Sequence, residues 1–382
     1  MKVCYIVSTL KGSGPINILY NIVKYLNREQ FEPSIITLSP EPKGSRKKDF
    51  ESLSIPVYSL NLSRLQGSFQ GLKNLSELVN KIDPDIIHSH GHRADILNSK
   101  LNVASIKVST IHNYAYEDYR MKYGKLVGSI TAYLNIKSFR DMDIAVACSK
   151  SIAKKMENYN INLNVIQNGV DLTKFNPVEE NEKIKLREKL SLPLDKQIFI
   201  SIGSLIKRKN PLQIIEAVKS TKIDVIVIFL GSGPLLEKCR KLVKNDERFK
   251  FPGHVSNPDE YLKASDVFIS ASQSEGLPNT VLEALASGIP VLLSNIGPHQ
   301  EILEYNQEAG RLFKLNDNNS LVNQMKKFLD EDYFTMEAPL SIVKRHLNAC
   351  KMSKQYQDLY KLKNDSKSKH PLNLASYGWN KN

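Results

Sequence analysis

Two glutamates separated by seven residues lie between Ser274 and Ala284, where Glu275 precedes Gly276-Leu277-Pro278-Asn279 and Glu283 comes later. Carboxylates often accept paired hydrogen bonds from sugar hydroxyls. We expect Glu275 in a loop after a strand and Glu283 about two turns into the following helix. Backbone groups at a helix start have no partner in the helix and can bind hydroxyls or phosphate. The segment can therefore hold a nucleotide sugar, although a dipole-stabilised carboxylate and a surface glutamate would also explain it.

The residues downstream narrow this choice. The second glutamate is followed by Ala286-Ser287-Gly288-Ile289-Pro290-Val291. Two glutamates at this spacing and then an A-x-G-x-P-V turn resemble retaining glycosyltransferase family 4, the glycosyl transferases group 1 of bacterial polysaccharide synthesis, whose two Rossmann-like domains form the GT-B fold. The resemblance implies that Glu275 lies beside the donor sugar, that residues 276–279 bind its hydroxyls, and that Glu283 holds the ribose.

A cation-rich loop, Gly203-Ser204-Leu205-Ile206-Lys207-Arg208-Lys209-Asn210, follows the first predicted strand of the second half. A loop of this kind at a strand end suits a diphosphate. The family has an arginine where Ser204 stands and a lysine five residues later, which Lys209 matches. Lys207 or Arg208 could supply the missing charge, or Ser204 could donate only a hydrogen bond. The alternative is a solvated basic loop.

A glycine loop, Gly12-Ser13-Gly14-Pro15, lies between the first predicted strand and its helix. It fails as a dinucleotide-binding fingerprint, because Asn17 stands where the third glycine is required. The loop resembles the first glycine loop of the family, whose amides approach the donor phosphate. The resemblance therefore places Gly12 and Gly14 in the donor site, although Ile16 replaces the usual glutamate.

Four histidines lie at the ends of two predicted strands: His88, His90, His92 and His112. The His-x-His-x-His pattern suggests zinc, but no fourth ligand is near in the sequence, and we predict no metal site. We also interpret Asp141-Met142-Asp143 as structural. The resemblance gives His112 a catalytic role in contact with the donor sugar, whereas a lone histidine is otherwise more often structural.

The formal net charge of +13 implies anionic partners. The lysines are dispersed and form no stripe with base-stacking aromatics, so we expect no nucleic-acid partner. The aromatic and basic stretch from Tyr114 to Lys125 could hold a lipid-linked pyrophosphate acceptor or lie on an anionic membrane, and an amphipathic helix with a solvated basic face is the alternative. With no membrane-spanning run and no signal-peptide layout, we expect a cytoplasmic location, with peripheral contact at the inner membrane face.

Apolar runs alternate with helical stretches in both halves of the chain and predict parallel sheets buried on both faces. We predict an α/β protein with two Rossmann-like domains facing across a cleft. The N-terminal, acceptor-side domain is expected over residues 1–170 and the C-terminal, nucleotide-sugar-binding domain over 171–348. Residues 349–382 are expected to form a helix that crosses back to the first domain, followed by a polar tail.

Together these features predict a retaining, metal-independent hexosyltransferase. It would use a UDP- or GDP-sugar as co-substrate, without a cofactor, and a lipid-linked glycan acceptor in capsule or lipopolysaccharide synthesis. Lys209 and the Gly14 amide would stabilise the leaving diphosphate, while Glu275 and His112 position the reactants. The alternatives are a sugar-nucleotide epimerase or a phosphorylase-like enzyme of the same fold, or a non-enzymatic binder of anionic ligands.

Overall fold

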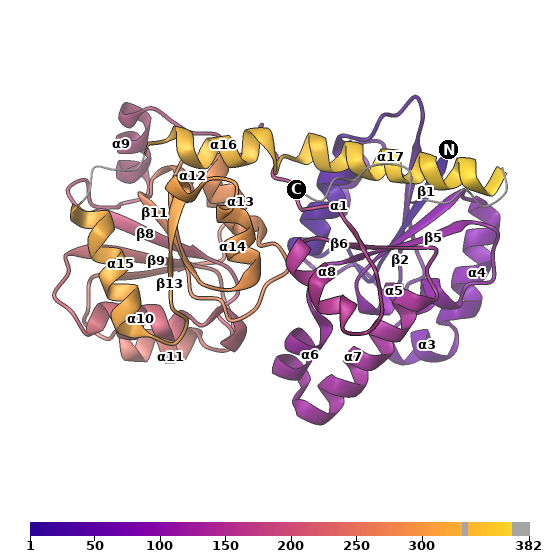
Figure 1. The fold of residues 1–382 in the computed structure, drawn as a ribbon, viewed down its shortest axis with the longest axis horizontal. Helices are drawn as coiled ribbons and strands as arrows, with labels where there is room; N and C mark the ends of the chain where they lie inside the picture. Colours follow the sequence, from indigo (N-terminus) through magenta and orange to yellow (C-terminus); the bar gives the residue numbers. More distant parts are fainter. Residues whose placement is uncertain (331–334, 369–382) are drawn as a thin grey trace. The chain divides into compact units, whose positions relative to one another are not determined.

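The chain forms two compact units in a computed structural model that describes residues 1–330 and 335–368 (Figure 1). The first unit contains Met1–Thr110, Ser138–Val146 and the described residues 352–368. The second contains Ile111–Lys137 and Ala147–Lys351. The domain boundaries expected from the sequence, after residues 170 and 348, stay predictions.

A seven-stranded sheet has the order β3-β2-β1-β4-β5-β6-β7. Its strands are β1 (Lys2–Val7), β2 (Glu32–Thr37), β3 (Val57–Ser59), β4 (Ile86–His90), β5 (Ile106–Ile111), β6 (Ile144–Ala147) and β7 (Asn164–Val165). The pairings from β3 to β5 are all parallel. Nearly every residue of β1 and β4 is buried, as expected for strands covered on both faces.

Helices connect these strands and set where their polar ends lie. They are α1 (Gly14–Lys24), α2 (Lys47–Ser52), α3 (Arg64–Phe69), α4 (Gly71–Ile82), α5 (His92–Lys100), α6 (Ala115–Tyr123), α7 (Lys125–Arg140) and α8 (Lys150–Glu157). Pro15 lies in the first turn of α1, where its missing N–H costs nothing. The turn before α1 contains Gly12, and Gly14 begins the helix.

The last described helix, α17 (Ala349–Ser368), packs in the first unit from Met352 onward. Ser353 donates to the Ile22 carbonyl at 2.7 Å, and Tyr360 Oη lies 2.7 Å from His88 Nδ1. His88 Nε2 lies 2.8 Å from Thr110 Oγ1, so both ring nitrogens have protein partners. His88 is therefore a buried structural residue. The polar tail expected after this helix lies outside the described residues from 369 onward.

The second unit contains a six-stranded parallel sheet of order β10-β9-β8-β11-β12-β13. Its strands are β8 (Gln197–Ile202), β9 (Val225–Leu230), β10 (Phe249–Gly253), β11 (Val267–Ser270), β12 (Val291–Ser294) and β13 (Gly310–Phe313). The chain proceeds outward from β8 in one direction and from β11 in the other. The loops after β8 and β11 therefore meet at the point where the strand order reverses, which is where α/β sheets bind ligands.

The remaining helices belong to this unit. They are α9 (Glu180–Lys189), α10 (Pro211–Lys219), α11 (Leu236–Leu242), α12 (Pro258–Lys263), α13 (Asn279–Ala286), α14 (Gly297–Leu303), α15 (Asn318–Asp330) and α16 (Glu337–Arg345), with 3₁₀ turns η1 (Lys207–Lys209) and η2 (Gln307–Ala309). Both sheets thus have the expected Rossmann-like α/β organisation.

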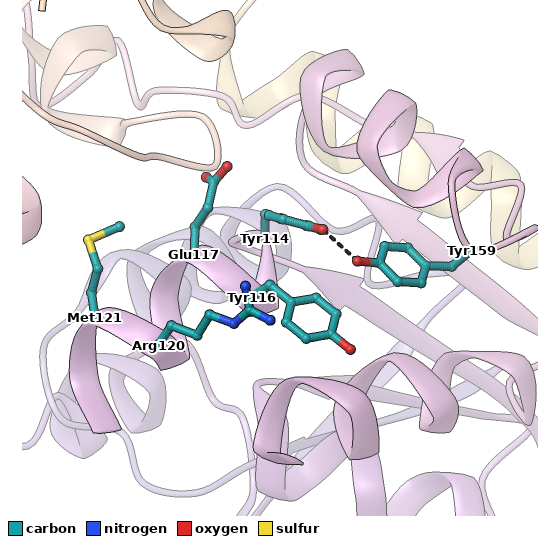
Figure 2. Close-up of a pocket in the computed structure, with 6 residues that line it drawn as sticks. All are labelled: Tyr114, Tyr116, Glu117, Arg120, Met121 and Tyr159. Carbon is teal, nitrogen blue, oxygen red and sulfur yellow. Dashed lines mark hydrogen bonds between the residues drawn. The ribbon is translucent and has the colours of Figure 1, made fainter. Parts of the chain in front are cut away.

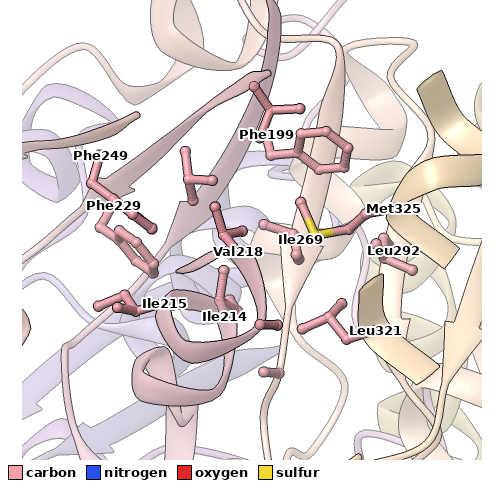
Figure 3. Close-up of a cluster of buried hydrophobic side chains, with 14 of the residues drawn as sticks. Phe199, Ile214, Ile215, Val218, Phe229, Phe249, Ile269, Leu292, Leu321 and Met325 are labelled. Atoms are coloured by element: carbon pink, nitrogen blue, oxygen red, sulfur yellow. The ribbon is translucent and has the colours of Figure 1, made fainter. Parts of the chain in front are cut away.

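The core of the second unit lies between this sheet and helices α10 and α15 (Figure 3). Phe199, Phe229 and Ile269 project from strands, and all three are fully buried. Ile214 of α10 and Leu321 of α15 contact the same cluster. This packing fixes β8 and β11 side by side, and with them the two loops that leave their carboxyl ends.

Phe229→Ala should lower the free energy of unfolding by about 3–5 kcal/mol, because it removes a buried ring from this core. The Phe229 ring stacks on Phe251 with centroids 5.2 Å apart, so that contact is lost as well. Urea denaturation measures the change. Leu194→Ala is the control, because Leu194 is 53% exposed and should change stability by no more than about 0.5 kcal/mol. Equal effects of the two substitutions would contradict the packing described.

Candidate functional site

A buried ion triad joins the loops after β8 and β11. Glu275 is 6% exposed, and its two carboxylate oxygens contact Lys209 Nζ at 2.5 Å and Arg208 Nη1 at 2.8 Å. Arg208 also donates to the Ser274 carbonyl at 2.7 Å. The Gln273 amide donates to the Arg208 carbonyl at 2.8 Å, which ties the two loops through their backbones. We call Glu275, Lys209 and Arg208 the ion triad.

The ion triad decides the protonation state of its carboxylate. Burial alone raises the pKa of Glu275, but the charges of Lys209 and Arg208 outweigh it and lower that pKa to about 2. Glu275 is therefore ionised at any physiological pH. It can accept hydrogen bonds and stabilise positive charge, but it has no proton to donate.

Ser204 stands where the family has an arginine, and Lys207 and Arg208 are the neighbouring residues that carry a positive charge. Arg208 points into the second unit and binds Glu275, whereas Lys207 and Ser204 are exposed. The Lys209 stem passes under Gly203, where an added Cβ would lie 3.5 Å from Lys209 Cε. Lys209 and Arg208 are thus the two cations paired with Glu275, and the binding of a diphosphate by Lys209 stays a prediction.

The loop after β9 supports this cation loop from behind. A Cβ on Gly231 would lie 2.1 Å from the Gly203 carbonyl oxygen, and the φ of Gly231 is +134°. The Leu205 amide donates to the Ser232 carbonyl at 2.9 Å. A side chain at position 231 would push the loops apart and displace Lys209.

Residues 276–279 contact the end of β5. A Cβ on Gly276 would lie 1.9 Å from the His112 carbonyl oxygen and 2.9 Å from Cys148 Sγ, so only glycine fits there. Asn168 Nδ2 donates to the Leu277 carbonyl at 2.8 Å and to Asn279 Oδ1 at 3.1 Å. The loop conformation is thus fixed from two sides.

The residues of this loop and of helix α13 differ in what they can offer a ligand. Pro278 has no amide hydrogen and donates no hydrogen bond, and Leu277 is buried. Asn279 begins α13, so Glu283 lies little more than one turn into the helix, not two as the sequence suggested. The strand before the loop ends at Ser270, and the loop is longer than expected because the helix begins later. Glu283 is half-buried, and its carbonyl accepts from the Ser287 amide at 3.1 Å.

The two residues expected to be catalytic lie at the same place in the second unit. His112 follows β5, and its carbonyl touches Gly276, the neighbour of Glu275. Burial lowers the pKa of His112 to about 4, so its imidazole is neutral at physiological pH. Burial also raises the pKa of the Cys148 thiol beside it, which argues against a nucleophilic cysteine.

Gly12 and Gly14 lie in the first unit, in the turn between β1 and α1. A Cβ on Gly12 would meet no atom within 4 Å, so packing does not demand glycine there. The Leu10 amide before this turn contacts both carboxylate oxygens of Glu41 at 3.0 Å. The part of Gly12 and Gly14 in donor binding stays a prediction.

Two acidic residues of α6 lie at the ion triad, Asp118 against Arg208 and Glu117 against the neighbouring Ser274, and the sequence analysis did not identify them. Ser274 Oγ donates to Glu117 Oε2 at 2.5 Å, and Arg208 Nε lies 3.5 Å from Asp118 Oδ1. Glu117 also pairs with Lys155 of α8 at 2.6 Å. These acidic residues precede the loops they touch by about 90 to 160 residues, so local spacing gives no signal for them.

Glu301 and His299 of α14 hold neighbouring parts of the site in place through buried hydrogen bonds. The Glu301 carboxylate is 3% exposed and accepts from the Lys150 amide at 2.7 Å and the Ser151 amide at 3.0 Å, so it caps α8. His299 is fully buried, with Nδ1 2.8 Å from the Ser294 carbonyl. Ser294 in turn donates to the Ser272 carbonyl at 2.6 Å. These contacts hold the β11 loop beneath Glu275.

A tyrosine-lined pocket of about 490 Å³ opens beside α6 (Figure 2). Tyr114 and Tyr159 hydrogen-bond through their hydroxyls at 2.8 Å, and the ring of Tyr116 stacks on Tyr159 with centroids 5.7 Å apart. The Arg120 guanidinium lies 4.8 Å above the Tyr116 ring. Glu117 lines the same pocket and connects it to the ion triad through Ser274. We call this the tyrosine pocket.

The described residues, 1–330 and 335–368, contain no cluster of three or more histidine, cysteine or acidic side chains that could hold a metal ion. In the same part of the chain, no helix combines the length and the apolar character needed to cross a membrane.

Comparison with known proteins gives two family matches. Residues 13–174 match the model described as Glycosyltransferase Family 4, and residues 182–345 match the model described as Glycosyl transferases group 1. An Escherichia coli UDP-Gal:alpha-D-GlcNAc-diphosphoundecaprenol alpha-1,3-galactosyltransferase is 29% identical over 84% of this chain and 85% of its own. The E. coli O-antigen biosynthesis glycosyltransferase WclY is 28% identical over 94% of this chain and 98% of its own.

The fold has a counterpart among solved structures. Anabaena HepE, in complex with UDP-glucose, superposes with a TM-score of 0.81 at 16% identity, over 95% of this chain and 100% of HepE. The two Rossmann-like parallel sheets thus have the GT-B fold, and the family matches identify the chain as a glycosyltransferase. The chain belongs to glycosyltransferase family 4.

The stability of the protein should fall as the pH drops from about 6.5 towards about 4. Burial lowers the pKa of His299 to about 4, so the folded state keeps this ring neutral while the unfolded state takes up a proton near its ordinary pKa. Between pH 6.5 and 5 the loss from His299 should be about 1–2 kcal/mol. Urea denaturation at both pH values measures it.

His299→Gln is the matched variant, since it cannot take up this proton. Its free energy of unfolding should change less between the two pH values than that of the wild-type protein, whatever its absolute stability. An identical pH dependence would show that His299 is not the group responsible.

Proposed function

We propose that the chain is a retaining, metal-independent hexosyltransferase. It transfers a sugar from a UDP- or GDP-sugar to a lipid-linked saccharide in the synthesis of a bacterial surface polysaccharide. The observation that carries the proposal is the ion triad, held at the carboxyl ends of β8 and β11 next to residues 276–279. Ligands of α/β sheets bind at this reversal of strand order.

The ion triad carries the charge that a nucleotide-sugar donor requires. Lys209 and Arg208 bring two positive charges to the end of β8, where they face Glu275 and, beside Arg208, Asp118, and we propose that the donor diphosphate binds to these two cations. Such preorganised charge stabilises a leaving group at no further reorganisation cost. The two cations are the support for a reaction without a metal, and the site requires no cofactor.

The protonation states of Glu275 and His112 support a same-face mechanism. Because Glu275 is ionised and His112 is neutral at physiological pH, neither is suited to act as a general acid. In the proposed step, the bond from the anomeric carbon to the diphosphate oxygen breaks and a bond to the acceptor oxygen forms. The acceptor proton passes to the leaving diphosphate. Glu275 and His112 position the sugar and polarise its hydroxyls.

The relatives support the choice of substrates. The E. coli galactosyltransferase carries in its name a UDP-sugar donor and an acceptor joined through diphosphate to undecaprenol, and HepE was solved with UDP-glucose. The CapH relative of Staphylococcus aureus is named for capsular polysaccharide biosynthesis. We extend these properties to this chain as a proposal, together with a cytoplasmic location at the inner membrane face.

The tyrosine pocket is the proposed site of the acceptor sugar. Aromatic ring faces pack against the apolar faces of sugar rings, and three tyrosines line this pocket. Glu117, which also lines it, accepts a hydrogen bond from Ser274, the neighbour of Glu275. Arg120 adds a cation at the same place, which suits a diphosphate-linked sugar.

Donor binding can be tested by thermal stability with UDP, GDP, CDP and ADP, each with and without EDTA. UDP or GDP should raise the Tm by a few degrees, about 2–4 °C for each kcal/mol of binding linkage, and EDTA should not change the rise. Lys209→Ala and Glu283→Ala should lose it, whereas the exposed Lys207→Ala should keep it. No rise at millimolar nucleotide, or a rise that EDTA abolishes, would contradict the proposed donor site.

Acceptor binding can be tested with Tyr116→Ala in a transfer assay. Loss of the stacked ring should raise the KM for a diphosphate-linked saccharide acceptor by about two- to tenfold, with the KM for the donor unchanged. Tyr58→Ala, which removes a tyrosine that is 41% exposed on β3, should leave both constants unchanged. An increase confined to the donor KM would place Tyr116 in a different role.

A further inference from the structure

Helix α7 exposes large apolar side chains where a helix of a soluble domain normally presents polar ones. Five such side chains are between 47% and 76% exposed: Leu126, Val127, Ile130, Tyr133 and Leu134. Their spacing of three and four residues places them along one side of the helix. We call these five residues the α7 apolar face.

The other side of α7 is packed against the protein. Ala132 and Ile136 are buried, and a Cβ on Gly128 would lie 2.4 Å from the Tyr119 carbonyl oxygen. The helix therefore already has its internal contacts on one side. The α7 apolar face is the opposite side, and it is exposed although the helix is packed against the protein.

The hydroxyl groups of α7 are turned back onto the helix. Ser129 Oγ donates to the Lys125 carbonyl at 2.5 Å, and Thr131 Oγ1 donates to the Val127 carbonyl at 2.8 Å. Hydroxyls that bond to the carbonyl four residues earlier have their donor satisfied without water. The free-energy cost of transferring these two hydroxyl groups from water into an apolar environment is therefore small.

Positive charges flank the apolar face, with no acidic residue among them. From Tyr119 to Arg140 the chain has five cations and no aspartate or glutamate; the cations are Arg120, Lys122, Lys125, Lys137 and Arg140. All five are exposed. An apolar stripe with basic residues around it complements a bilayer surface that carries anionic headgroups.

We propose that the α7 apolar face docks on an anionic phospholipid bilayer, with its apolar side chains among the acyl chains and its lysines at the headgroups. A second copy of the chain is a poorer occupant, because a symmetric contact would bring the two sets of five cations together. The docking itself does not rest on the proposed transfer reaction.

Arg120 links this face to the tyrosine pocket. Its Nε donates to Ser129 Oγ of α7 at 2.8 Å, while its guanidinium lies over Tyr116. Docking through α7 would therefore bring the tyrosine pocket to the membrane surface. If the proposed function holds, a diphosphate-linked sugar anchored in the bilayer could then enter the pocket without leaving the membrane.

The test is flotation of the full chain with vesicles of phosphatidylcholine alone or mixed with phosphatidylglycerol. The wild-type protein should float with the mixed vesicles, and added salt should weaken binding. Leu126→Ser with Ile130→Ser should reduce partitioning about tenfold or more. Lys122→Gln with Lys125→Gln should reduce it about fivefold for each charge removed.

The matched control is Leu65→Ser with Phe69→Ser, which removes two apolar side chains of α3 that are 78% and 88% exposed. This variant should float as well as the wild-type protein. Binding that persists in both α7 variants, or that falls equally in the control, would overturn the proposal. So would a concentration-dependent dimer that disappears in the Leu126 and Ile130 variant while no vesicle binding is seen.

The nucleotide-dependent Tm rise separates this inference from the proposed function. The Leu126 and Ile130 variant should keep any Tm rise of the wild-type protein, which also shows that it is folded. Vesicle binding without a nucleotide response in the wild-type protein would remove the proposed function and leave the membrane surface in place.

Discussion

A carboxylate buried between two cations is the interaction on which the rest of the site depends. Moving Glu275 out of water is costly, and only the combined charge of Lys209 and Arg208 keeps it ionised. Removing one partner of such a buried pair typically costs about 3–5 kcal/mol. The ion triad is therefore stable only as a set, and its three members come from two loops that the sheet must hold together.

The surrounding structure holds the members of the ion triad in place. The core under β8 and β11 fixes the two strands, and the glycine loop after β9 fixes the path of the Lys209 loop. Gly276 can approach the His112 carbonyl because it has no side chain. Ser274 and Arg208 then extend the contacts of the ion triad to α6, so the triad and the tyrosine pocket are joined by direct side-chain contacts.

The sequence predicted the features that depend on local pattern. Apolar runs indicated the parallel strands, and the motif around Glu275 indicated the family, both of which are confirmed. The motif also brought Lys209 and Glu275 into one site, and the structure pairs them directly. It gave no sign of Glu117 or Asp118, because their partners are remote in the sequence. Apolar residues of α7 lie on both its buried and its exposed sides, so their spacing does not show which of them remain exposed, and the exposed stripe could be found only in three dimensions.

The position of α17 has a consequence for the order in which the protein is made. Tyr356 and Tyr360, which are 1% and 0% exposed, fill the first unit around His88 and Tyr5. Those partners leave the ribosome at the beginning of synthesis, and the two tyrosines leave it near the end. The first unit must therefore wait, with part of its interior open to water, until almost the whole chain has been translated.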